Sequence, residues 1–165
     1  MKIIQKIEPH LWFETRAEEA ARFYVSVFQN SEIGRIVRYT DEGHDIHGMP
    51  AGSVMTVEFA IEGQTFIALN GGPVFKFNEA ISFVIHCETQ DEVDYYWEKM
   101  TADGGEESMC DWLKDKFGVS WQVVPTALTE MIADPDIEKV KRMTRVMFTM
   151  KKLDIDVLKR AFEGK

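Results

Sequence analysis

The sequence has no long hydrophobic run, no excess of positive charge and few cysteines, and each shortage argues against a class of protein. No run of 18 apolar residues occurs in the 165 residues, so we expect no membrane-spanning helix. The formal net charge of -9 argues against nucleic acid or an anionic membrane as partner, because both attract basic surfaces. Cys87 and Cys110 are the two cysteines. The N-terminus does not read as a signal peptide, so we expect free thiols and a cytoplasmic protein.

The sequence also lacks the short motifs of several common chemistries. It contains no G-x-S-x-G nucleophile motif. The glycine pair at 71–72 does not open a helix, so it fits a backbone turn better than a phosphate-binding loop. No stretch resembles a dinucleotide or S-adenosylmethionine loop. His44 and His47 lie in a glycine-containing segment, 41–52, that reads as a solvated loop rather than as a pair of metal ligands.

The sequence contains an internal repeat of one strand and helix pattern. In each copy a strand runs into an amphipathic helix, and further strands with alternating apolar residues follow. The first copy has strands at 7–13, 33–40, 53–61 and 64–70 with a helix at 15–28; the second has strands at 81–87, near 107–113 and at 119–124 with a helix at 91–101. This pattern predicts an α+β fold in one domain, made of two βαβββ modules at residues 1–73 and 74–125 that face each other across a cleft.

Residues 126–165 form a helical tail that has no counterpart in the first copy. Helices are expected at 126–133, 136–150 and 154–162. Two of them carry apolar faces that must be covered either by the domain itself or by a second subunit: Val140, Met143 and Met147, and Ile155, Leu158 and Phe162.

Strand alternation predicts which side chains face the cleft. On the first strand Leu11 and Phe13 suit the helix side, which leaves His10 and Trp12 for the cleft. The same reasoning places Ser82 and His86, then Gln122, and then Phe66, Ala68 and Asn70 on the cleft side, with Trp112 close by and Glu58 on a neighbouring strand. Aromatic and aliphatic walls with a few neutral polar groups are typical of a small-molecule pocket.

Four stretches resemble the PhnB-like family, also named 3-demethylubiquinone-9 3-methyltransferase, of the vicinal oxygen chelate superfamily that includes glyoxalase I, bleomycin-binding and fosfomycin-resistance proteins. They are LNGGPVFKFNEAISF (69–83), TQDEVDYYW (89–97), CDWLKDKFGVSWQVVP (110–125) and MKKLDIDVLKRAF (150–162). The resemblance covers nearly the whole chain. It implies paired βαβββ modules and a homodimer, often with elements exchanged between subunits. One departure is Asp111, where relatives commonly have glycine.

The superfamily's four metal positions correspond to His10, Asn70, Ser82 and Gln122. Only His10 is a usual ligand for zinc, nickel or iron, because amide and hydroxyl oxygens bind these ions weakly. We therefore expect no cofactor and no tightly bound metal, and a weakly held divalent metal stays open.

Three hypotheses for function follow. The first is a metal-free binding module whose cleft (His10, Trp12, Asn70, Ser82, His86, Trp112 and Gln122) holds a small molecule. The second is an isomerase- or lyase-type enzyme in which His10 or Glu58 acts as base, with or without a weakly held metal. The third is the methyl transfer in the family's name, which the missing glycine loop argues against.

Overall fold

The computed structural model describes residues 6–165. Contacts between residues divide the chain into two compact units, residues 1–76 and 77–165, and each is described by itself. None of the helices in residues 6–165 combines the length and hydrophobicity that a membrane-spanning helix needs.

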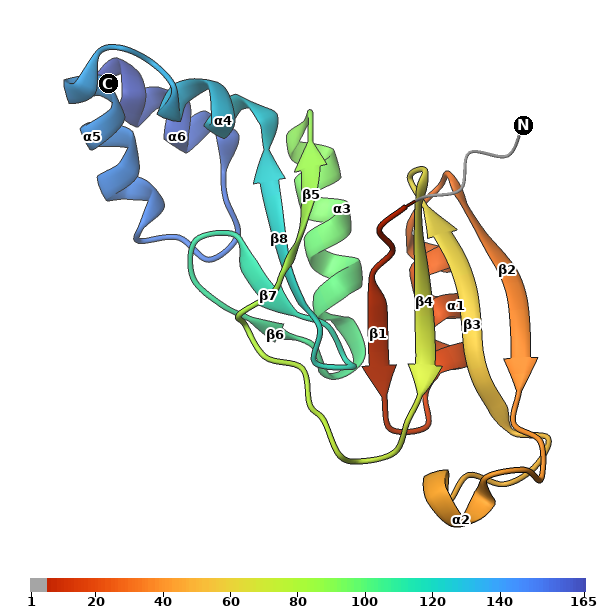
Figure 1. The fold of residues 1–165 in the computed structure, drawn as a ribbon. Helices are drawn as coiled ribbons and strands as arrows, with labels where there is room; N and C mark the ends of the chain where they lie inside the picture. Colours follow the sequence, from red (N-terminus) through yellow and green to blue (C-terminus); the bar gives the residue numbers. More distant parts are fainter. Residues whose placement is uncertain (1–5) are drawn as a thin grey trace. The chain divides into compact units, whose positions relative to one another are not determined.

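The first unit is a four-stranded sheet with one helix packed on it. Its strands are β1 (His10–Phe13), β2 (Ser31–Arg38), β3 (Val54–Ile61) and β4 (Gln64–Asn70), in the order β1-β4-β3-β2. β1 pairs parallel to β4, and the other pairs are antiparallel. Helix α1 (Ala17–Val27) covers one face of the sheet (Figure 1). Buried apolar side chains from α1 and from the strands, Tyr24, Phe59 and Phe66 among them, stack into the core between the two layers.

The second unit repeats this plan. Strands β5 (Phe83–Cys87), β6 (Glu106–Glu107), β7 (Trp112–Lys114) and β8 (Ser120–Pro125) form a sheet in the order β5-β8-β7-β6. β5 and β8 are parallel, as β1 and β4 are in the first unit. Helix α3 (Gln90–Thr101) covers one face of this sheet, followed by the short 3-10 helix η1 (Ala102–Gly104). The matching strand orders confirm the predicted α+β fold of two βαβββ modules.

The C-terminal tail at residues 126–165, called the extension from here on, is helical, as predicted. Helices α4 (Thr126–Ile132), α5 (Ile137–Met147) and α6 (Ile155–Glu163) follow β8 directly. Their apolar faces form a core of their own within the second unit, containing Leu128, Met131, Met143, Leu153, Leu158 and Phe162. Of the two ways to cover these faces, the domain itself is therefore the one that the structure uses.

Two segments differ from the sequence-based expectation. The segment 41–52, expected to be a loop, contains the one-turn helix α2 (His44–His47) between two glycines with positive φ. The strand expected near 107–113 is instead two short strands, β6 and β7, with a turn between them. Cys110 and Asp111 in this turn have φ values of 53° and 67°. Two consecutive non-glycine residues with positive φ are uncommon, so the sequence did not predict this turn.

Candidate functional site

The face of the first sheet that α1 leaves uncovered carries three of the predicted residues. His10 and Trp12 lie on it, as the alternation predicted, while Leu11 and Phe13 are buried. His10 is in register with Ile67, and Ile67 is in register with Glu58, so His10 and Glu58 lie in one row, two strands apart. Both are partly open to solvent. The Nε2 atom of His10 lies 3.5 Å from a Glu8 carboxylate oxygen, and Glu58 lies 3.6 Å from Arg35.

Trp12 is held in place by the glycine turn that follows β4. Its indole N–H donates to the Gly72 carbonyl at 3.0 Å, and Phe75 meets the ring edge to face at 5.0 Å. A Cβ atom at Gly71 would lie 2.1 Å from the Trp12 ring. Glycine at position 71 is therefore required so that the backbone can pass close to the indole.

Asn70 does not face the uncovered side, so the predicted orientation of β4 was wrong. Asn70 is in register with Phe13 and is only 5% exposed. Its Oδ1 accepts the Ala17 N–H at 2.8 Å, at the start of α1, and its Nδ2 donates to the Val54 carbonyl at 3.0 Å. Phe66 and Ala68 share this buried face. The polar amide serves the N-terminus of a helix, which strand alternation alone does not reveal.

The uncovered face of the second sheet brings together the other predicted residues. Val84, Gln122 and Trp112 lie in one row across β5, β8 and β7. The Gln122 side-chain N–H donates to the Ser82 hydroxyl at 2.7 Å. His86 is exposed and lies in register with Val124.

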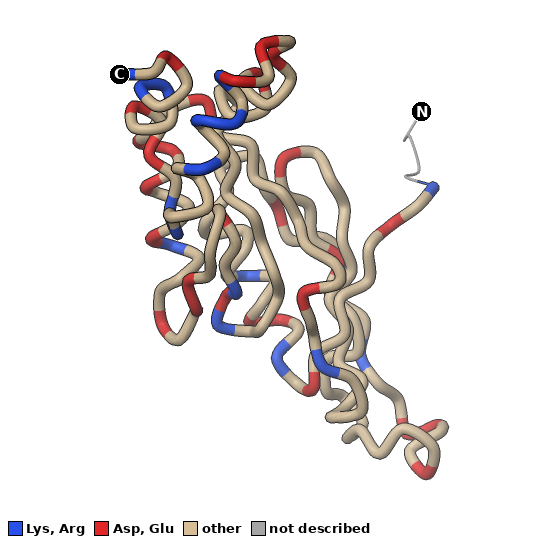
Figure 2. Tube along the Cα trace, turned by 90° about the vertical axis from the view of Figure 1, so that its left-hand side faces the viewer, with Lys and Arg blue, Asp and Glu red and all other residues tan. Residues whose placement is uncertain are grey.

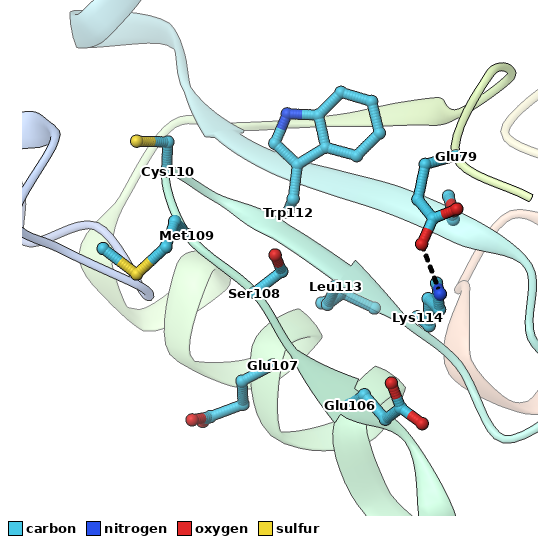
Figure 3. A pocket seen from close by; sticks show the side chains of 10 residues that line it. Glu79, Glu106, Glu107, Ser108, Met109, Cys110, Trp112, Leu113 and Lys114 are labelled. Carbon is cyan, nitrogen blue, oxygen red and sulfur yellow. Dashed lines mark ion pairs between the residues drawn. The ribbon is translucent and has the colours of Figure 1, made fainter.

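A pocket of 540 Å³ lies beside this row, at the β6–β7 edge of the second sheet (Figure 3). Trp112 was the one predicted site residue among those that line it. The lining residues are Glu79, Glu106, Glu107, Ser108, Met109, Cys110, Trp112, Leu113, Lys114 and Ser120. Most of the others come from the segment 106–114, the turn and edge strands that sequence reasoning misread; Glu79 lies in the connection before β5, and Ser120 lies on β8.

Carboxylates outnumber amines around the pocket. Lys114 forms an ion pair with Glu79, which lowers the pKa of the Glu79 carboxyl and raises the pKa of Lys114. The charge of Glu106, in register with Lys114, further raises the Lys114 pKa. Glu107 accepts the Trp97 indole N–H at 2.8 Å and lies 3.5 Å from Lys151. The lining set therefore has a surplus of negative charge.

Ser120 gives the pocket an unsatisfied polar group. The residue is 2% exposed and lines the pocket, and its hydroxyl has no hydrogen-bond partner within the described chain. Buried hydroxyls are usually hydrogen-bonded, and an orphaned one points to a missing partner such as water or a ligand.

The two cysteines differ in their surroundings. Cys87 is buried, and burial raises the pKa of its thiol to about 12, as expected of an unreactive thiol in the core. Cys110 is half-buried and lines the pocket; its thiol donates to the Met147 carbonyl at 3.7 Å. Burial, with the charge of Asp111, raises the pKa of the Cys110 thiol, so a thiolate nucleophile is disfavoured.

The side chains at the superfamily's metal positions do not fit a metal. Asn70 is buried and uses its amide on α1 and β3, and Gln122 is bonded to Ser82. Across residues 6–165, no three His, Cys, Asp or Glu side chains converge closely enough to hold an ion.

The comparisons with known proteins agree with the fold. The family model described as 3-demethylubiquinone-9 3-methyltransferase matches residues 5–124. A putative 3-demethylubiquinone-9 3-methyltransferase, PhnB protein, from Bacillus cereus is 37% identical, with a TM-score of 0.64 over 73% of this chain and 99% of that chain. The search of curated proteins found no match.

Two more distant structures show the same fold. Protein PA1353 from Pseudomonas aeruginosa is 17% identical, with a TM-score of 0.56 over 74% of this chain and 98% of that one. The fosfomycin resistance protein FosX from Listeria monocytogenes is 17% identical, with a TM-score of 0.52 over 80% and 99%. The chain therefore belongs to the PhnB-like, 3-demethylubiquinone-9 3-methyltransferase family and has the glyoxalase/bleomycin-resistance fold of the vicinal oxygen chelate superfamily.

Proposed function

We propose that the protein binds an organic small molecule in the pocket on the second sheet and does not use a tightly bound metal. The observation that carries the proposal is a 540 Å³ pocket that is lined both by Trp112 and by Ser120, whose buried hydroxyl has no hydrogen-bond partner in residues 6–165. Its volume lies within the roughly 300–1,000 Å³ of small-molecule sites. Trp112, Met109 and Leu113 supply apolar wall, and the pocket is more charged than such sites usually are.

The charges of the pocket favour a neutral or cationic ligand over an anion. Lys114 is the one amine among the lining residues, and it already lies close to two carboxylates. An anionic group would have to displace Glu79 and would still face Glu106. A cation would gain attraction from the surplus carboxylate and from the face of Trp112.

The proposal includes the uncovered face of the first sheet as a further ligand-contacting surface. Trp12, fixed by the glycine turn, offers a rigid aromatic surface, and His10 offers a polar group open to solvent. We expect His10 and Trp12 on the first sheet, and Gln122 and Ser82 at the second, to be ligand-contacting residues.

Native mass spectrometry before and after denaturation tests the proposal. We expect an organic molecule to be released on denaturation, with no stoichiometric metal. The variant Trp112→Ala should lose most of the bound molecule, whereas Ile137→Ala, which removes an exposed apolar side chain from α5, should keep it. If Trp112→Ala retains the full amount, or if a stoichiometric metal is found, the proposal is wrong.

The placement of His10 and Glu58 in one row favours a second candidate, an enzyme that uses one of them as a general base. Saturable binding of a divalent metal with micromolar affinity that disappears in His10→Ala would favour this candidate over metal-free binding. A titration without binding would disfavour its metal-assisted form.

Methyl transfer is not part of the proposal. The connections from β1 to α1 and from β5 to α3 contain no glycine, whereas glycine-rich loops at such strand–helix junctions bind nucleotide cofactors. Binding of S-adenosylmethionine in isothermal titration calorimetry would overturn this exclusion.

A further inference from the structure

The family model matches residues 5–124 and leaves out the C-terminal extension, including the stretch at 150–162 that resembled the family in sequence. The family model ends at residue 124, one residue before β8 ends and α4 begins. The extension nevertheless contacts the pocket. Its segment Met147–Leu153, between α5 and α6, runs beside the turn Met109–Asp111, and Met109 and Cys110 line the pocket.

The contact consists of specific hydrogen bonds. The Cys110 N–H donates to the Met150 carbonyl at 2.8 Å, and the Asp111 N–H donates to the Lys151 carbonyl at 2.9 Å. The Cys110 thiol donates to the Met147 carbonyl. Both residues of the turn have positive φ without being glycine, a conformation that persists only when its surroundings hold it.

Gln90, at the start of α3, fastens the same segment to the rest of the unit. Its side-chain N–H donates to the Leu153 carbonyl at 3.1 Å, and its side-chain oxygen accepts the Ile155 N–H at 2.9 Å. Gln90 does not line the pocket.

Charge reinforces this attachment. Nine of the chain's 19 lysines and arginines lie in residues 126–165, so the extension is more basic than the acidic remainder of the chain (Figure 2). Two of these lysines lie within the segment Met147–Leu153: Lys151 lies 3.5 Å from the pocket residue Glu107, and Lys152 pairs with Asp94 on α3.

We propose that the extension helps to form the ligand site. Segment Met147–Leu153, held by Gln90, keeps the Met109–Asp111 turn in the conformation that forms one wall of the pocket. Gln90 is then a positioning residue that acts on the pocket through this segment. The inference rests on the proposed function for the role of the pocket, but the mechanical link can be measured without any ligand.

The thiol of Cys110 serves as the probe. The full-length protein is treated with 5,5′-dithiobis(2-nitrobenzoic acid), and the labelled residue is identified by peptide mass spectrometry. Cys87 is buried with a raised thiol pKa, so labelling under native conditions reports on Cys110. We expect Gln90→Ala to label Cys110 about tenfold faster than the unmodified chain. Gln90→Glu keeps the acceptor for Ile155 but loses the donor to Leu153, and should label at an intermediate rate.

Lys141→Ala is the matched control, because it breaks an exposed ion pair with Glu138 on α5 without touching the segment. Hydrogen exchange locates the effect: faster exchange confined to 109–111 and 147–155 supports the proposal. Equal labelling of Gln90→Ala and the unmodified chain overturns it, as does faster exchange spread over the whole second sheet. Native mass spectrometry that finds no bound molecule would contradict the proposed function and leave this labelling result unaffected.

Discussion

At the scale of single residues, the Asp111 carboxyl is buried where the chain gives it too few partners. The residue is 6% exposed, and its Oδ1 has no hydrogen-bond partner in residues 6–165. Burial alone raises the pKa of this carboxyl from 3.8 to about 7. Its φ of 67° is a conformation that glycine adopts without strain and other residues adopt less often.

The raised pKa predicts a loss of stability with rising pH. The unfolded chain releases this proton above pH 3.8, whereas the folded chain keeps it until about pH 7. The folded state therefore binds more protons between these values, and the free energy of unfolding falls as pH rises through this window. The loss should approach about 4 kcal/mol above pH 7, because a tenfold difference in proton affinity between the folded and unfolded chains corresponds to about 1.4 kcal/mol.

Urea unfolding of the unmodified chain and of Asp111→Asn, at pH 5 and pH 8, measures this loss. Asparagine tolerates positive φ and does not titrate, so the variant should gain stability relative to the unmodified chain as pH rises. A difference between the two proteins that is the same at both pH values would contradict the assignment to Asp111.

Asn70 is a residue whose face of the sheet could not be predicted from the sequence. Side chains alternate along 64–70, but the alternation does not say which set faces the helix. Sequence reasoning assigned the set with the Asn70 amide to the open face. The helix α1 lacks a side-chain cap from its own preceding residue, Arg16. Asn70 supplies the acceptor from a strand 53 residues away in sequence, and no local pattern announces a partner at that distance.

We predict that Asn70→Ala destabilises the protein by about 3 kcal/mol, because one buried and one partly buried backbone group lose their partner. Asn70→Asp should cost less, since it keeps the acceptor for Ala17 and loses only the donor to Val54. Thermal unfolding of both variants gives the order. An alanine variant as stable as the unmodified chain would show that the amide is not needed for folding.

At the scale of elements, apolar periodicity predicts most of the fold because each helix and strand buries one face. The expected strand at 64–70 matches β4, and the expected helices at 91–101 and 126–133 match α3 and α4 to within one residue at each end. The failure at 107–113 has a physical cause. A reversal through two consecutive non-glycine residues with positive φ is held by the distant segment at 150–151, so the local sequence carries no turn signal.

The packing of α5 on α6 gives a prediction at this scale. Arg142 of α5 donates to the carbonyls of Ala161 and Phe162 in the last turn of α6, at 3.3 and 2.8 Å. Carbonyls in the last turn of a helix lack their usual partners within it, although the Ala161 carbonyl also accepts the Gly164 N–H at 3.2 Å. A cation near these carbonyls also favours the helix dipole. Arg142→Ala should lower the free energy of unfolding by about 2 kcal/mol.

Arg145→Ala is the control for this prediction, because Arg145 is an exposed residue on the same helix. It should change stability by less than about 0.5 kcal/mol. Equal losses for the two variants in urea unfolding would mean that the loss of any arginine side chain from α5, rather than the contact with α6, sets the cost.

At the scale of the whole molecule, the repeat in the sequence predicted two modules, and the structure shows two sheets with the same strand order. The sequence left open what covers the apolar faces of the extension. The answer depends on tertiary packing: Met143 and Leu158 are buried against each other's helices in a shared core. The extension therefore no longer argues for a second subunit.

The homodimer stays a prediction, now resting on family resemblance and on another segment. Val74 and Ile81, in the connection before β5, are 70% and 73% exposed. Exposed aliphatic side chains in one short segment are typical of an interface between subunits.

We expect light scattering after size exclusion to give about 38 kDa, twice the 19.0 kDa of the chain. The double variant Val74→Asp/Ile81→Asp should move the mass toward 19 kDa, whereas Ile137→Asp, at a residue 62% exposed on the extension, should leave the dimer intact. A monomeric unmodified chain would contradict the dimer itself, and a dimer that persists in the double variant would place the interface elsewhere.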